Sequence, residues 1–262
     1  MKSSSLHFRA IAYALAGYTF WIAADTFIKL ASTLAEPKYE IVGIAAFSGM
    51  AVLLIMAAVR GRVRHLRPQH APGLGALAVL MVLVYIFGVL GLQRLPLVDY
   101  YAVIYLAPII VSFVAARLLR EPLSWRRIAA ILAGFTGVMI AVGIFSTKNG
   151  GDWTGYGYAF LAMLTSASQQ LIMRFLANRE SGECTSFYPR FGPVLACLAA
   201  GFVFGFAPMS MRSVVYSVLI GTLGGFGWLY IAEAYKRAYA STVAPYQYSQ
   251  IVSGAIIGYA VW

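Results

Sequence analysis

Long apolar segments follow one another along almost the whole 262-residue chain, and they constrain its fold more than any other feature. A helix of about 20 apolar residues is long enough to cross the hydrocarbon core of a bilayer. The sequence predicts an all-α integral membrane protein with about nine such helices and short connections. The expected spans are residues 9–32, 39–60, 72–93, 96–118, 125–146, 154–176, 186–207, 213–235 and 239–262.

The composition excludes the usual soluble classes. Hydrophobic residues make up 61% of the chain and charged residues 11%, whereas roughly a quarter of a soluble domain is charged. The net charge of +11 does not indicate nucleic-acid binding, because the basic residues form short clusters between apolar segments. The first segment follows Lys2 and Arg9 as a signal peptide would, but its length, together with Asp25 and Lys29, indicates an uncleaved helix.

The distribution of Lys and Arg predicts the orientation, since these residues favour cytoplasmic loops. With a cytoplasmic N-terminus, 15 of the 20 basic residues lie in inner segments. The inner residues are Lys2, Arg9, Arg60, Arg62, Arg64, Arg67, Arg117, Arg120, Arg126, Arg127, Arg174, Arg179, Arg190, Lys236 and Arg237, and the outer ones are Lys29, Lys38, Arg94, Lys148 and Arg212. We expect a plasma membrane protein, with the bacterial inner membrane favoured, whose basic clusters contact lipid head groups.

Parts of the first half of the chain resemble parts of the second. Leu92–Arg120 and Ala234–Trp262 both begin with a polar basic turn and continue into a helix with Tyr, Pro and small residues. Asp25 in the first segment corresponds to Gln170 in the sixth at almost the same separation along the chain. These matches indicate an internal repeat of about half the chain.

A repeat of five helices crosses the membrane an odd number of times, so its second copy must be inverted. We assign the first repeat to residues 1–150 with five helices, and the second to residues 151–262 with four helices. Inverted repeats are a common plan among transporters, with the substrate site at the repeat interface near the membrane midplane. The pattern therefore predicts alternating access by movement of one half against the other.

The stretch Gln93–Gly143 resembles the signature of the fourth and fifth helices of EamA-type carriers in the drug/metabolite transporter superfamily. The resemblance depends on Arg94, Pro108, Glu121, Leu123, Ser124, Arg126 and Gly137. The segment Tyr235–Trp262 is similar to the ninth helix of that family through Ala244, Pro245 and Tyr248. The resemblance implies a ten-helix carrier of small metabolites.

The sequence departs from that family pattern in two places. Many relatives carry an arginine in the second helix after a Pro-x-x-Glu entry, but here Ile41–Phe47 follows Glu40 without one. The chain stops at Trp262 within apolar sequence, where the resemblance implies a further helix. We therefore expect the tenth helix to be missing from this chain and the second repeat to be incomplete.

Charged and polar residues inside a span are costly, so each one is a candidate for function. Asp25 and Lys29 share a helix face. They either line a cavity or neutralise each other between helices, with Lys29 reaching outward. Gln170 lies deep enough to require a hydrogen-bond partner and is a cavity candidate. Glu233 is expected to pair with the basic residues that follow it.

Aromatic and amide side chains complete the expected binding site. Such groups suit a flat or cationic organic solute, and the alternative is ordinary aromatic packing. The candidate substrate-binding residues are Asp25, Trp21, Tyr101, Tyr105, Gln170, Trp228, Tyr230, Tyr248 and Gln250. Pro108, Pro193 and Pro245 lie inside spans, where the missing backbone donor is expected to kink the helix.

Three classes of function are compatible with these features. A carrier of a small molecule is favoured, and without a nucleotide-binding motif it would use a solute or ion gradient. An intramembrane enzyme is disfavoured, because His7, His65 and His70 lie outside the spans and no nucleophile motif is present. A non-transporting membrane subunit or a truncated remnant stays open, as does a homodimer. No catalytic residue, metal or cofactor is expected, and the substrate is not assigned.

Overall fold

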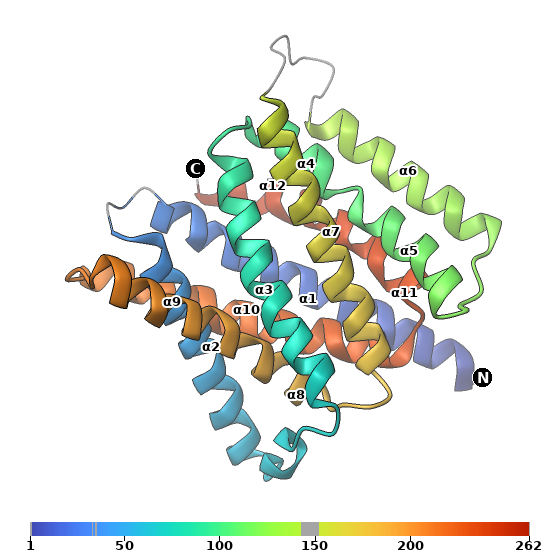
Figure 1. The fold of residues 1–262 in the computed structure, drawn as a ribbon. Coiled ribbons are helices and arrows are strands. Elements are labelled where there is room, and N and C mark those ends of the chain that lie inside the picture. Colours follow the sequence, from blue (N-terminus) through green and yellow to red (C-terminus); the bar gives the residue numbers. More distant parts are fainter. Residues whose placement is uncertain (1, 33, 35, 143–151, 262) are drawn as a thin grey trace.

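The computed structural model describes residues 2–32, 34, 36–142 and 152–261, which fold into helices joined by short connections (Figure 1). The α-helices are α1 (Lys2–Ser32), α2 (Lys38–Val59), α3 (Ala71–Leu92), α4 (Leu97–Ile104), α5 (Ala107–Leu118), α6 (Trp125–Val142), α7 (Trp153–Leu176), α8 (Gly182–Phe187), α9 (Phe191–Phe204), α10 (Met211–Arg237), α11 (Ala240–Val243) and α12 (Ser249–Val261). Short 3₁₀ helices connect some of them, namely η1 (Val63–Leu66), η3 (Tyr188–Arg190) and η4 (Ala244–Tyr248).

Within the described ranges, six helical segments are long and apolar enough to cross a membrane. They are Phe8–Ala31, Lys38–Val59, Ala71–Leu92, Asp99–Leu118, Gly182–Phe204 and Met211–Arg237. This confirms the all-α membrane class. The other three expected spans contain α6, α7 and the segment from α11 to α12, which are not among the six. α7 carries Gln169, Gln170 and Arg174, and α12 has only 13 residues. The count of nine spans therefore stays a prediction.

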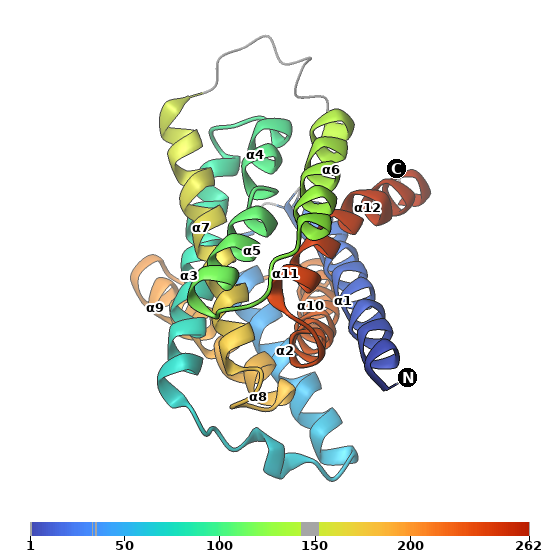
Figure 2. The same cartoon turned by 90° about the vertical axis from the view of Figure 1, so that its right-hand side faces the viewer.

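The largest helix interfaces join the first half of the chain to the second. α1 packs along α10, α3 packs along α7, and α2 packs against both α9 and α10 (Figures 1 and 2). The expected boundary between repeats, at residues 150 and 151, lies outside the described residues. If the chain consists of two repeats, they are interleaved rather than separate, and any cavity in the centre is shared between them.

Glycine allows the closest of these approaches. A Cβ atom on Gly17 of α1 would lie 3.0 Å from the carbonyl oxygen of Gly227 of α10. A Cβ atom on Gly227 would lie 3.1 Å from the carbonyl oxygen of Gly17. Small residues at helix interfaces let backbones come close together in membranes. The contact holds the middle of α1 against the middle of α10.

Each of the three candidate prolines lies at a break between shorter helices. The expected span 96–118 divides after Ile104, and Pro108 lies in the first turn of α5. Pro193 lies in the first turn of α9, directly after η3, and Pro245 lies within η4. Proline has no N–H to donate, so it is tolerated in the first turn of a helix but not in its interior.

The two ends of the molecule differ in their connections. At one end, where Figure 2 shows α8, Arg62 pairs with Glu183 at 3.7 Å and Ser181 donates a hydrogen bond to the carbonyl oxygen of His65 at 2.5 Å. At the other end Arg94 pairs with Asp152 at 2.8 Å, and this hydrogen bond lowers the pKa of Asp152. We call the first the basic end, because the Arg-rich connections after α2 and α7 meet there.

One basic residue does not fit the predicted topology. The charge count places Arg190 in an inner connection, but the structure places it inside the apolar segment Gly182–Phe204. Its side chain is buried, with 3% of the residue exposed. Its assignment to a loop was wrong, because the span begins earlier than the apolar pattern indicates. Lys148, counted as an outer residue, lies outside the described residues.

Candidate functional site

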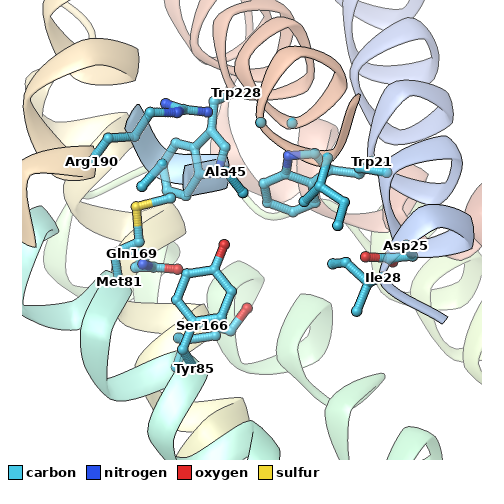
Figure 3. A pocket seen from close by; sticks show the side chains of 16 residues that line it. Trp21, Asp25, Ile28, Ala45, Met81, Tyr85, Ser166, Gln169, Arg190 and Trp228 are labelled. Atoms are coloured by element: carbon cyan, nitrogen blue, oxygen red, sulfur yellow. The ribbon is translucent and has the colours of Figure 1, made fainter. Parts of the chain in front are cut away.

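A cavity of about 210 Å³ lies between α1, α2, α3, α7 and α10 and contains side chains from both halves of the chain (Figure 3). Small and apolar residues form much of its wall, including Ala24, Ala45, Ala46, Met81, Ile220, Gly221 and Gly224. Its polar groups are Asp25, Tyr85, Ser166, Gln169 and Arg190, and the indole rings of Trp21 and Trp228 also face it. A few polar groups on an apolar, aromatic wall are typical of sites for small organic ligands.

Asp25 is an exposed carboxylate on the wall of this cavity, although it belongs to an apolar span. Its charge interacts with the hydroxyl groups of Tyr85, Tyr100, Tyr101 and Tyr105, which come from α3, α4 and the residue after α4. The structure describes both Asp25 and Lys29 and forms no ion pair between them. Asp25 therefore presents a negative charge among aromatic rings.

Trp21 and Trp228 form an aromatic wall next to this charge. Their ring centroids are 5.6 Å apart with an interplanar angle of 60°. Trp21 also packs edge-on against Tyr18 at 6.0 Å. The close approach of α1 and α10 at Gly17 and Gly227 brings the two indoles together, so an apolar or cationic group could lie against their faces.

Three of the candidate tyrosines form a separate cluster between α4, α6 and the end of η4. Tyr101 stacks on Tyr105 at 5.9 Å, and the hydroxyl of Tyr248 donates a hydrogen bond to the carbonyl oxygen of Tyr105 at 3.2 Å. Val138 and Met139 of α6 pack against them. These tyrosines are not among the residues that line the cavity, but Tyr101 and Tyr105 interact with the charge of Asp25.

Gln170, Tyr230 and Gln250 are also not among the cavity-lining residues. The side chain of Gln170 accepts a hydrogen bond from Tyr235 at 2.9 Å and donates one to Gln247 at 3.2 Å. This satisfies its need for a partner within the helix packing. The ring of Tyr230 packs against Tyr13 at 5.6 Å and against Phe20 at 5.5 Å. Gln250 is buried in α12.

Sequence reasoning missed four cavity residues: Tyr85, Ser166, Gln169 and Arg190. Gln169 and Gln170 are adjacent, and successive residues on a helix point about 100° apart, so only one of them could face the cavity. Arg190 fell inside the expected span 186–207, and its cost in a membrane could have marked it as a candidate. Tyr85 and Ser166 carry no comparable signal in the sequence.

A buried polar network closes the packing between the cavity and the basic end. Glu121 accepts hydrogen bonds from Nε of Arg174 at 2.6 Å and from the backbone N–H of Ala240 at 2.7 Å. Nη1 of Arg174 donates to the carbonyl oxygen of Tyr235 at 2.5 Å. The network joins the α5–α6 connection to α7, α10 and α11. Nearby, Glu233 pairs with the two basic residues that follow it, as the sequence predicted.

Comparison with known proteins adds independent information. Residues 8–143 match the EamA-like transporter family. An S-adenosylmethionine uptake transporter of Rickettsia prowazekii (strain Madrid E) is 24% identical over 172 residues, which are 66% of this chain and 57% of that protein. The match therefore spans little more than half of the relative.

A crystal structure titled only as that of a protein has the same fold, with a TM-score of 0.77 at 20% identity. The match covers 94% of this chain and 88% of the other. The family is one of transporters, which agrees with the prediction that this chain is not an enzyme. Because the family match covers more than half of its residues, this chain belongs to the EamA-like transporter family.

Proposed function

We propose that this chain is a secondary transporter of a small organic metabolite, and that the cavity between α1, α2, α3, α7 and α10 is its substrate site. The observation that carries the proposal is the convergence of polar groups from both halves on one cavity. Asp25 and Tyr85 come from the first half, and Gln169 and Arg190 from the second. Such groups are costly inside a membrane, so their gathering at one cavity favours a function over a packing role.

Alternating access would follow from two inverted repeats, residues 1–150 and 151–262, that together provide nine spans. The interleaved packing of the two halves supports this arrangement, because movement between them would change access to a shared cavity. The meeting of the Arg-rich connections at the basic end supports a cytoplasmic N-terminus. We place the protein in the plasma membrane, with the bacterial inner membrane favoured.

The structure fits a state that is closed toward the basic end. Tyr18, Met173 and Tyr235 lie further toward that end than the cavity residues on the same helices, and all three are almost completely buried. Asp25 and Ile28, at the opposite end of the cavity, are exposed. With the basic end in the cytoplasm, this arrangement corresponds to an outward-open carrier.

The name of the Rickettsia relative makes S-adenosylmethionine a candidate substrate to test here. This molecule combines a flat adenine ring with a sulfonium cation and an amino-acid group. The rings of Trp21 and Trp228 suit the flat part, and the carboxylate of Asp25 suits a cation. These features agree with the flat or cationic solute that the aromatic residues of the sequence suggest.

Uptake into proteoliposomes tests the proposal. The purified chain would be reconstituted, offered a mixed pool of small metabolites that includes S-adenosylmethionine, and its lumenal contents read by mass spectrometry against empty vesicles. Selective accumulation is expected. If no compound accumulates although correct insertion is verified, the proposal fails and a non-transporting subunit or a truncated remnant becomes the better account.

A further inference from the structure

Two opposite charges face the same cavity without pairing with each other. Arg190 is almost completely buried, and its Nη1 donates a hydrogen bond to the backbone carbonyl oxygen of Ser186. Asp25 is exposed within the cavity. Five ion pairs form in the part of the chain that the structure describes, and neither residue takes part in them. A guanidinium inside a membrane protein without a counter-ion is costly.

The fold provides space for Arg190 at a contact between α2 and α10. A Cβ atom on Gly49 would lie 2.7 Å from Nε of Arg190 and 2.7 Å from the carbonyl oxygen of Gly221. Only a glycine leaves room there for the arginine side chain to pass. The guanidinium carries five N–H donors, and one carbonyl oxygen does not satisfy them. Arg190 is therefore held in place with donors available to a ligand in the cavity.

The surroundings of the two charges differ. Arg190 interacts electrostatically with Tyr85, whereas Asp25 interacts with Tyr85 and with the tyrosines of α4. In Figure 3 Arg190 and Asp25 lie on opposite sides of the view, with the rings of Trp228, Trp21 and Tyr85 between them. A ligand in this space would meet a cationic donor group at one side, aromatic faces in the middle and a carboxylate at the other.

We infer that the transported solute is a zwitterion whose carboxylate binds Arg190 and whose cationic group binds beside Asp25, an inference that rests on the proposed transport function. A guanidinium matches the planar geometry of a carboxylate, and charge-assisted hydrogen bonds are the stronger kind. A solute that carries only a cation would leave Arg190 without a partner. A solute that carries only an anion would leave Asp25 without one. A zwitterion satisfies both groups at once.

Matched sets of solutes test this inference in proteoliposomes. One set is S-adenosylmethionine with its decarboxylated form, and a second is tryptophan with tryptamine and indole-3-propionate, within the same mixed metabolite pool. The zwitterion of any transported set is expected to exceed its singly charged partners by about 10- to 100-fold, the range expected for one charged hydrogen-bonded contact. Compounds accumulated from the rest of the pool are expected to carry both charges.

Variants assign each charge to its residue. Arg190→Gln is expected to abolish the preference for the carboxylate, and Arg190→Lys to keep part of it. Asp25→Asn is expected to abolish the preference for the cationic group. Thermal unfolding in detergent, measured on each variant, shows that the protein is folded.

The possible results separate the two proposals. Uptake of neutral or singly charged compounds at the level of their zwitterionic partners overturns the zwitterion inference and leaves transport standing. The same holds if Arg190→Gln is folded, transports and still prefers the carboxylate. An absence of uptake from the entire pool by the inserted wild-type protein overturns the transport function as well.

Discussion

Arg174 and Arg190 are both arginines within the helical part of the chain, yet their surroundings are opposite. Arg174 bonds to Glu121 at 2.6 Å and to the carbonyl oxygen of Tyr235 at 2.5 Å, and its guanidinium lies 5.6 Å from the ring centre of Tyr239. Arg190 has the carbonyl oxygen of Ser186 as its hydrogen-bond partner among the described residues, and it faces the cavity. The first arginine is satisfied by the fold and the second is left for a ligand.

This difference shows that residue type alone does not separate structural from functional charges. The sequence places both arginines in the inner, topology-setting group, and only their partners distinguish them. A paired charge of this kind stabilises the connections that it joins, so removing its partner affects folding. An unpaired charge in a cavity contributes little to the fold, so removing it affects binding. The following experiments break or sharpen that comparison.

The largest effect is expected for the paired site. Glu121→Ala would leave the guanidinium of Arg174 and the backbone N–H of Ala240 without their acceptor. We expect the free energy of unfolding to fall by about 3–5 kcal/mol, the usual result of breaking a buried ion pair. Denaturant or thermal unfolding in detergent measures this change.

The matched control for Glu121 is Glu183→Ala. Glu183 pairs at 3.7 Å with Arg62, whose side chain is half exposed. Its loss should change the free energy of unfolding by less than about 1 kcal/mol, because exposed pairs contribute little. Equal effects of the two substitutions would mean that the Glu121 network is not the structural contact described here.

The next largest effect is expected at Gly49, which makes room for Arg190. Gly49→Ala would press its Cβ atom against Arg190 and the backbone of Gly221, at a cost of about 1–3 kcal/mol in the free energy of unfolding and with loss of uptake. Gly224→Ala is the matched control, since Gly224 also lines the cavity but its Cβ atom would have no neighbour within 4 Å. If both variants transport equally well, the position of Arg190 does not depend on Gly49.

A smaller difference is expected between two acidic residues of the spans. Asp25→Asn should reduce uptake about tenfold, because it removes the carboxylate that faces the cavity, whereas Glu233→Gln should reduce it much less. Glu233 pairs with Lys236 at 3.4 Å and is not among the cavity-lining residues. Uptake is compared at equal surface expression. Equal activity of the two variants would contradict a role for Asp25 in the cavity.

The smallest effect is expected at the end opposite the basic end. Hydrogen bonds from Ser210 and Ser213 lower the pKa of Glu36 to about 2 from its ordinary value of 4.5. A carboxyl group with a lowered pKa stabilises the fold above the ordinary value, and this contribution is lost as pH falls from about 4.5 toward 2. Glu36→Gln should reduce the loss of stability over that window only slightly, because the site is solvent-exposed. Unfolding midpoints measured against pH test this.

The helices themselves could be predicted from the sequence to within a few residues. The expected spans 39–60 and 72–93 correspond to α2 and α3, because an uninterrupted apolar segment with the right length has few alternatives in a bilayer. The break between α4 and α5 was not predicted. A proline inside an apolar segment indicates either a kink or a new helix, and the packing of neighbouring helices decides between them.

The site was harder to predict, because it depends on which helix face meets which neighbour. Trp228 lines the cavity, whereas Tyr230, two residues later on the same helix, packs against α1 away from it. Both are aromatic residues in a membrane span, so the sequence alone does not separate them. Asp25 and Trp21 were selected and do line the cavity, since they lie on one face of α1. Arg190 was missed because it was counted as a loop residue.

The most direct test compares Arg190→Gln with Arg174→Gln in one experiment that measures thermal unfolding and uptake per folded molecule. We predict that Arg190→Gln unfolds at or above the wild-type temperature and loses uptake of the transported zwitterion by about tenfold or more. Arg174→Gln should unfold at a clearly lower temperature, because Glu121 stays buried without its cation. The reverse result, in which Arg190→Gln unfolds early and Arg174→Gln is stable but inactive, would contradict the division between a structural arginine and a ligand-binding one.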